Sequence, residues 1–380
     1  MRQPNYFSEL NAEEIIRGIE EWVLVESPST DVKGVNKMMD LAEAAMAGLE
    51  SLTERIPGRD GFGDLVKAQT PWGGDGPGIL ILGHLDTVHQ VGTLDGSLPL
   101  RREGDKIYDP GIYDMKGGMY ITYYALRQIV RAAGETPLPV TFMFIPDEEM
   151  GSPTTRALIE AEAQKNKYVL VPEPAQDSGR LITGRWAFAR FRLHARGTPA
   201  HAGATLSQGH SSIREMARQI IHIEEMSDPG RNITLSVGVI QGGTFVNVVP
   251  IDCRAEVLAV MPTQEAFDEI CARMLALESF DPDVELRVEQ GPVRPLFKAD
   301  ENVIALYRKA EEIARDIGFD PGHSEVGGGS DGNFTGVLGI PTLDGLGVCG
   351  DGFHTHNEHL LVSSLVPRTR LLMRLLKELT

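Results

Sequence analysis

Hydrophobic positions in the first half of the chain follow two alternating periodicities, which predicts alternating helices and strands. Apolar residues at helical spacing mark three stretches, 12–26, 32–50 and 116–133. Fully apolar runs, which are typical of strands buried on both faces, occupy 79–82, 140–145 and 168–171. Ser152 and Pro153 favour a helix start, with serine as N-cap and proline at the first helical position. The alternation predicts an α/β fold, in which helices cover both faces of a mostly parallel sheet.

The pattern changes near residue 184. Apolar and polar residues alternate strictly from Ala189 to Arg196, which predicts a strand with one solvent-facing side. Two helices are then expected at 210–227 and 263–279, and three strands at 233–237, 253–260 and 284–288. The order β-α-β-β-α-β is that of a small ferredoxin-like domain. We therefore expect residues 184–292 to form a ferredoxin-like α+β domain. It would be inserted into a larger α/β domain that residues 1–183 and 293–380 build together.

Charge and composition narrow the classes of partner. The net charge of −18 argues against a nucleic-acid partner, because binding to a phosphate backbone needs a basic face. No apolar run approaches the roughly 20 residues that span a bilayer, so we expect no membrane partner. The polar segment Met1–Leu10 lacks the features of a secretory signal. Cys253, Cys271 and Cys349 are too widely spaced to suggest a disulfide framework or a thiolate zinc site. A reduced, cytoplasmic setting is the simplest interpretation.

Acidic residues and histidines recur directly after the predicted strands. They follow the three buried runs in the segments Gly83–Thr87, Pro146–Gly151 and Val171–Pro174. Two more clusters are Asp109–Gly118, which opens a helix, and His354–Glu358 near the C-terminus. Taken singly, such pairs are more often surface loops or solvated faces. The carboxyl ends of successive strands converge in space, however, and converging carboxylates repel unless a cation neutralises them. Histidine and carboxylate ligands without a thiolate suit zinc, manganese or cobalt in a catalytic site.

With these segments in this order, the chain resembles the metallopeptidase family of glutamate carboxypeptidase, acetylornithine deacetylase and succinyl-diaminopimelate desuccinylase. The similarity covers nearly the whole chain. Glu173-Pro174, Thr198–Gly203 and Gly327–Asp331 are most similar to the glutamate carboxypeptidase branch. The resemblance implies an aminopeptidase-like catalytic domain with an inserted lid and dimerisation domain. It also implies two divalent metal ions per chain. Zinc is the expected metal, and manganese and cobalt are the alternatives.

The resemblance also assigns roles to single residues. Asp114 would bridge the two metals, and a cis peptide bond would follow it. One metal would take His84 and Glu173, and the other His354 and Glu149. Asp86 would hold the imidazole of His84, and Glu148 would act as general base. Two metals about 3.5–4 Å apart do need one shared carboxylate and terminal ligands of their own.

Further residues match substrate contacts of the family. His201, in the inserted domain, would polarise the scissile carbonyl, and Asn247 would contact the substrate. The loop that contains Gly328, Gly329 and Ser330 would present backbone N–H groups to a carboxylate.

One position departs from the family pattern. Val260 stands where glutamate carboxypeptidase relatives carry an arginine that binds the substrate's terminal carboxylate. Valine cannot form that contact. Either Arg185 or Arg294 replaces the arginine, or the substrate is not a plain C-terminal glutamate.

Histidines outside the motifs are interpreted conservatively. We read His89 as a loop residue, and His356 and His359 as residues beside the site or on the surface. The apolar faces of the helices expected at 210–227 and 263–279 are expected to pack in the core. One of these helices would pair with its copy in a homodimer.

The function implied is hydrolysis of an amide or peptide bond of a small molecule or short peptide, in the manner of a carboxypeptidase. A metal-bound hydroxide would attack, with Glu148 as base. The alternative is an N-acyl amino acid deacylase, or a hydrolase that removes a substituent from an aromatic acid. A catalytically inactive binding protein would need a lost ligand or base, and each motif position is filled. A nucleotide-binding protein would need a glycine-rich motif after the first strand, which the sequence lacks.

Overall fold

The computed structural model describes residues 10–176 and 179–380, so nearly all of the polar segment Met1–Leu10 lies outside the described residues. The chain divides into two compact units. The larger unit contains the residues up to Gly184 together with Phe297–Val326 and Ser330–Thr380. The smaller unit contains Arg185–Leu296 and the short segment Gly327–Gly329.

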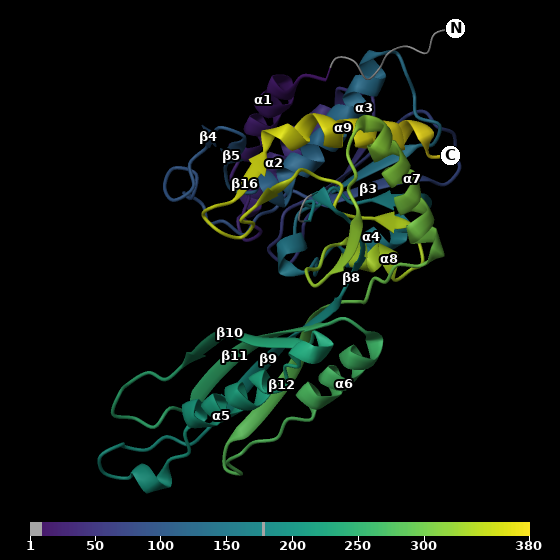
Figure 1. Cartoon of the computed structure of the whole chain (residues 1–380). Helices are drawn as coiled ribbons and strands as arrows, with labels where there is room; N and C mark the ends of the chain where they lie inside the picture. Colours follow the sequence, from purple (N-terminus) through teal and green to yellow (C-terminus); the bar gives the residue numbers. More distant parts are fainter. Residues whose placement is uncertain (1–9, 177–178) are drawn as a thin grey trace. The chain divides into compact units, whose positions relative to one another are not determined.

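A six-stranded sheet forms the centre of the larger unit (Figure 1). In spatial order its strands are β1 (Leu52–Ile56), β2 (Leu65–Gln69), β6 (Val140–Ile145), β3 (Gly78–His84), β7 (Asn166–Leu170) and β14 (Thr342–Leu343). The four strands from β6 to β14 run parallel. Strand β2 is antiparallel to its neighbours β6 and β1, so β1 runs in the same direction as the four parallel strands. All residues of β3 and β6 are buried, which confirms the strands predicted from the apolar runs.

Helices cover both faces of this sheet, as predicted, because alternate residues of each central strand face opposite sides. Ile79 and Ile81 pack into one core with five helices: α1 (Ala12–Val23), α2 (Val32–Ala47), α3 (Gly117–Arg131), α7 (Glu301–Ile317) and α9 (Val362–Glu378). Leu80 and Leu82 pack into a second core with α4 (Arg156–Ala163) and α8 (Gly332–Gly336).

Short strands complete the larger unit. A second sheet contains, in spatial order, β15 (Gly350–Asp351), β16 (His359–Leu361), β5 (Lys106–Tyr108) and β4 (Arg101–Glu103). Two further strands, β8 (Leu181–Arg185) and β13 (His323–Val326), pair with each other. Within the described part of the chain, no helix combines the length and the apolar character that crossing a membrane requires.

The predicted start of α4 at Ser152 and Pro153 is wrong. The helix begins at Arg156 with Thr155 as N-cap, and Ser152 has a left-handed φ of 53°. The buried carboxylate of Asp147 accepts hydrogen bonds from the backbone N–H of Thr154, at 2.8 Å, and from the hydroxyls of Thr154 and Thr155. The hydroxyl of Ser152 donates to Asp331 instead of capping the helix. These tertiary contacts hold the segment before α4 in an irregular turn.

The smaller unit has the predicted order β-α-β-β-α-β. Its elements are β9 (Ala187–Arg196), α5 (Ser212–Glu224), β10 (Thr234–Gly242), β11 (Asp252–Met261), α6 (Gln264–Leu275) and β12 (Glu285–Arg294). The antiparallel sheet has the spatial order β10-β11-β9-β12. Alternate residues of β9, from Ala189 to Ala195, are buried in a separate core with α5 and α6, which confirms the alternating pattern. Cys253, Cys271 and Cys349 are free cysteines.

Candidate metal centre

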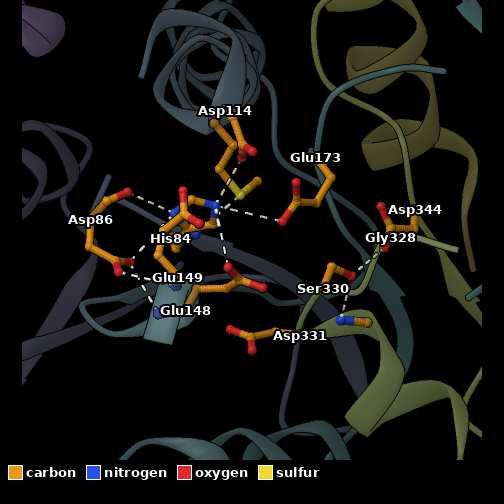
Figure 2. A network of polar contacts seen from close by, with 12 residues as sticks. His84, Asp86, Asp114, Glu148, Glu149, Glu173, Gly328, Ser330, Asp331 and Asp344 are labelled. Atoms are coloured by element: carbon orange, nitrogen blue, oxygen red, sulfur yellow. Dashed lines mark hydrogen bonds and ion pairs between the residues drawn. The ribbon is translucent and has the colours of Figure 1, made fainter. Parts of the chain in front are cut away.

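The buried side chain of His84 lies at the centre of a group of carboxylates (Figure 2). His84 ends the buried strand β3, and its Nδ1 lies 2.9 Å from the backbone carbonyl oxygen of Asp86. Because a carbonyl only accepts hydrogen bonds, Nδ1 carries a proton and Nε2 faces the carboxylates. Nε2 lies 3.1 Å from Oδ1 of Asp114 and 3.7 Å from Oε1 of Glu173. His84 therefore presents one ring nitrogen to two acidic side chains.

Asp114 lies between two histidines. Its Oδ1 faces His84, and its Oδ2 lies 3.3 Å from Nε2 of His354. The peptide bond from Asp114 to Met115 is cis, as expected. A carboxylate that turns one oxygen to each of two imidazoles has the arrangement that a bridging ligand needs.

The carboxylate of Glu149 lies next to His354. Its Oε2 lies 3.1 Å from Nε2 of His354. Glu149 also groups with His84 and Asp114, with one ligand atom of each within 4.8 Å of the others. All five residues expected to bind metal are thus brought together within the larger unit. Glu173 lies beside His84 and Glu149 lies beside His354, and Glu149 is also near His84.

Glu148 and Asp86 lie next to this group. Glu148 and Glu149 sit on a short 3-10 turn after β6, not on the strand itself, and Oε2 of Glu148 is 4.0 Å from Nε2 of His84. The carboxylate of Asp86 accepts hydrogen bonds from the backbone N–H groups of Glu148 and Glu149, both at 3.2 Å. Its Oδ1 is 3.5 Å from Nδ1 of His84. Asp86 therefore holds the imidazole mainly through its backbone carbonyl, while its carboxylate fixes the turn that carries the two glutamates.

The pKa shifts show that this site favours positive charge. Hydrogen bonds to Asp114 and Glu149 raise the pKa of His354 to about 11. Burial opposes protonation of His84, but hydrogen bonds to Asp114 and Asp86 raise its pKa well above the usual value. Burial also opposes ionisation of Asp114, yet its bonds to His354 and His84 lower its pKa. In the metal-free protein both imidazoles therefore favour the protonated form. The nitrogen and oxygen donors fit two divalent ions such as zinc, manganese or cobalt.

The expected substrate residues of the smaller unit lie on adjacent loops. His201 and Asn247 are exposed, and the backbone N–H of Ala202 donates to the carbonyl oxygen of Asn247 at 2.9 Å. Gly328 is also exposed, and Nη1 of Arg185 donates to its carbonyl oxygen at 2.8 Å. A side chain at Gly329 would collide with the ring of Phe188.

Ser330 departs from the expected role. It is fully buried, its N–H donates to Oδ1 of Asn333 at 3.0 Å, and its hydroxyl donates to Asp344 at 2.6 Å. Its donors are used inside the larger unit. The expectation of a substrate cradle therefore rests on Gly328 and Gly329.

Val260 shares a row of the smaller sheet with one of the two candidate arginines. Val260 on β11 and Arg294 on β12 both pair with Phe188 of β9, one from each side. Directly opposed residues of antiparallel strands point to the same face of a sheet. The side chains of Arg185 and Arg294 are both buried. An arginine is thus present in the row of Val260, two strands away.

Sequence reasoning missed two partners of the metal-binding segments. His89 lies in a loop, as expected, but its side chain is buried, and its Nε2 lies 2.6 Å from Oε2 of Glu358. Glu358 also accepts three backbone hydrogen bonds from the loop that leads to Asp114. His359 is buried beside Tyr108, and His356 is exposed, in line with the roles expected for them. Only the spacing between His354 and Glu358 hinted at a role for the acid.

Known proteins resemble this chain in sequence and in fold. The family model of peptidase family M20/M25/M40 matches residues 80–378. Carboxypeptidase G2 of Pseudomonas sp. (strain RS-16) is 29% identical over 364 residues, which cover 93% of this chain and 86% of that protein. Succinyl-diaminopimelate desuccinylase of Hydrogenovibrio crunogenus (strain DSM 25203 / XCL-2) is 25% identical over 336 residues, which cover 82% of this chain and 86% of that protein. The solved structure of an M20 family metallo-carboxypeptidase from Sulfolobus solfataricus matches with a TM-score of 0.75 at 16% identity, covering 96% of this chain and 98% of the other. The chain therefore belongs to peptidase family M20/M25/M40 and is a metal-dependent hydrolase of small amide or peptide substrates.

Proposed function

We propose that the larger unit holds two divalent metal ions, zinc first, and hydrolyses the amide bond of a small carboxypeptidase-like substrate. The observation that supports this most directly is Asp114, whose two oxygens face the Nε2 atoms of His84 and His354. In this proposal Asp114 would be shared by the two ions, His84 and Glu173 would hold one of them, and His354 and Glu149 would hold the other. Manganese and cobalt are the alternative metals for this donor set.

Glu148 is the proposed general base. The metal ions, when bound, supply a coordinated water of lowered pKa and polarise the substrate carbonyl. The Glu148 carboxylate takes the proton of the attacking water and passes it to the leaving amine. Asp86 supports this role because its carboxylate fixes the turn of Glu148 and Glu149 through two backbone N–H groups. Glu148 can therefore remain a base while its neighbour Glu149 serves as a ligand.

His201 and Asn247 are the proposed substrate contacts of the smaller unit. In this role His201 stabilises the negative charge that develops on the scissile carbonyl oxygen, an effect typically worth a few kcal/mol. Their exposure and their position on adjacent loops support a role in binding a ligand rather than in packing. Gly328 and Gly329 are the proposed backbone contacts to a substrate carboxylate.

A second candidate activity is deacylation of an N-acylated amino acid, or removal of a substituent from an aromatic acid. Val260 is the reason to consider this second activity, because valine cannot form a bidentate contact to a terminal carboxylate. A panel of N-acyl-glutamates, dipeptides and N-acetyl amino acids separates the two activities. Hydrolysis of the N-acetyl amino acids in preference to the N-acyl-glutamates and dipeptides would select the second.

We also propose a cytoplasmic homodimer that forms through the smaller unit. Strand β10 lies at the edge of its sheet, and its Val239 and Ile240 are about half exposed. Ile221 of helix α5, which packs on β10, is 61% exposed. Exposed sheet edges with apolar side chains pair readily with another chain. The free cysteines support a reducing compartment.

The decisive experiment compares Glu148→Gln with Glu149→Gln, using Glu160→Gln on α4 as the control. We expect Glu148→Gln to keep two metals per chain by elemental analysis and to lose about 10²–10⁴-fold in kcat. Glu149→Gln should lose metal as well as activity, and Glu160→Gln should change neither. A fully active Glu148→Gln enzyme would contradict the proposed mechanism.

A further inference from the structure

The buried carboxylate of Glu358 accepts four hydrogen bonds and uses both of its oxygens. Oε1 accepts the backbone N–H groups of Tyr113 and Asp114, at 2.9 and 3.1 Å. Oε2 accepts the backbone N–H of Gly111 at 3.1 Å and Nε2 of His89 at 2.6 Å. The side chain of Glu358 is only 1% exposed. Burying a carboxylate is costly unless its oxygens are hydrogen-bonded, and here each oxygen has two donors.

Three segments that carry proposed metal ligands meet at this carboxylate. Glu358 itself follows His354 by four residues in the same turn region. The backbone donors belong to the loop that presents Asp114. His89 follows His84 by five residues, after the end of β3. One carboxylate therefore links the segments of the bridging acid and of both histidines.

The loop before Asp114 has little freedom to find another position. Gly111 adopts a left-handed φ of 75°, and a Cβ at this position would lie 2.5 Å from Cγ2 of Thr87. Its N–H points to Glu358, as do those of Tyr113 and Asp114. Three N–H groups converging on one acceptor fix the orientation of this loop.

We propose that Glu358, held by His89, is a positioning residue that sets the distance between the two metal sites. It keeps the Asp114 carboxylate aimed at His84 and His354 at the same time. The inference rests on the proposed function, because it concerns how that metal pair is assembled. Glu358 contacts the backbone of a ligand loop, and its effect appears in metal affinity and geometry before it appears in the chemical step.

The expected loss of metal affinity can be judged from other metal sites. Removing a residue that orients a metal ligand typically costs about 10–100-fold in metal affinity. Glu358→Gln replaces one acceptor oxygen by an N–H donor, which then faces a pair of donors. We therefore expect a loss in this range, together with altered ligand geometry. His89→Ala removes one of the four donors and should cause a smaller loss in the same direction. His89→Gln keeps a terminal N–H donor and should restore wild-type affinity.

Glu215 provides a matched control in the smaller unit. It is also a buried glutamate, and its carboxylate accepts the backbone N–H groups of Phe280 and Asp281, at 3.0 and 3.1 Å, and the side-chain amide of Gln219. Glu215→Gln therefore imposes a similar loss of acceptors on a loop that carries none of the proposed metal ligands. It should lower the melting temperature and leave metal affinity unchanged.

The test is a titration of the chelator-treated full chain with cobalt(II), followed by the visible absorption of the bound ion and by metal analysis. The melting temperature of each variant is measured in parallel. We expect Glu358→Gln to weaken cobalt binding about 10–100-fold and to change the absorption band, with rescue by His89→Gln relative to His89→Ala.

Three results would overturn the inference. They are wild-type affinity and spectrum in folded Glu358→Gln protein, an equal loss of affinity in Glu215→Gln, or equal affinities in the two His89 variants. If Glu358→Gln does not fold, the His89 pair decides alone. A wild-type protein that binds fewer than two cobalt ions would contradict the proposed function itself, and with it this inference.

Discussion

Binding of metal to the metal-free protein is expected to release protons, because each histidine at the site must give up one. Hydrogen bonds to Asp114 and Glu149 raise the pKa of His354 to about 11. At pH 7 this imidazole is therefore almost entirely protonated. The pKa of His84 is also raised well above its usual value, by hydrogen bonds to Asp114 and Asp86 that outweigh the effect of burial. Only the neutral imidazole binds a metal, so filling both sites displaces about two protons per chain.

The consequence is a steep pH dependence of metal binding. Near pH 7 the overall binding constant for two ions should rise roughly 100-fold for each unit of pH, tenfold for each displaced proton. The stability of the metal-free fold changes with pH in the opposite direction. A histidine whose pKa is raised from 6.5 to about 11 stabilises the folded state fully below pH 6.5, and this contribution is lost as the pH rises through about 11. Alkaline pH thus weakens the metal-free fold while it favours the metal-bound one.

Calorimetric titration with zinc in buffers of different ionisation enthalpy measures the protons released per chain. The control is His354→Ala, which should release about one proton fewer and lose one metal ion. Release of less than one proton by the wild-type protein would refute the reasoning. If His354→Ala released as many protons as the wild-type protein, the role assigned to His354 would be refuted.

Three further predictions concern other parts of the molecule. Burial raises the pKa of Asp109 to about 8 against the opposing effect of the Lys116 charge, and among the described residues its carboxylate has no hydrogen-bond partner. Its charge therefore opposes folding increasingly between about pH 4 and pH 8, and Asp109→Asn should raise the melting temperature at pH 8 but not at pH 4. Ile240→Lys places a charge on the edge strand β10, and sedimentation should show a monomer that keeps its metal if the dimer forms there. Val260→Arg should raise kcat/KM for substrates with a free C-terminal carboxylate by about tenfold over their amides, since a charge-assisted bond adds about 1.5–3 kcal/mol. Val260→Met is the control for side-chain size, and an equal change for both substrate types would contradict the prediction.

The resemblance to the family assigned a role to each proposed ligand and to the base, but strong local signals in the sequence mark several of these positions. His84 directly ends a buried strand, and Glu148 and Glu149 follow another after only two residues, so the sheet itself brings them together. Asp114 and His354 follow no such run, and for them the resemblance was the main guide. The order of elements in the smaller unit was also predictable, because each strand and helix has its own periodicity.

Contacts between segments distant in sequence could not be predicted in the same way. His89 and Glu358 are 269 positions apart, and neither lies in a periodic pattern that would pair them. The start of α4 was misplaced for a similar reason, because Ser152 contacts Asp331, 179 positions away. In both cases a local preference was weaker than a buried hydrogen bond that forms only in the folded chain.

Under the proposed roles, the residues for metal assembly and those for substrate choice belong to different units. The five proposed metal ligands, Glu148, Glu358 and His89 all belong to the larger unit, whereas His201, Asn247, Val260 and Arg294 belong to the smaller one. Substitutions that touch no common partner usually have additive effects. A double variant of Glu358 and Val260 should therefore combine the metal affinity of the first with the substrate preference of the second. Selection can then change the substrate through the smaller unit while the ligand geometry, which depends on Asp114 and its supports, stays fixed.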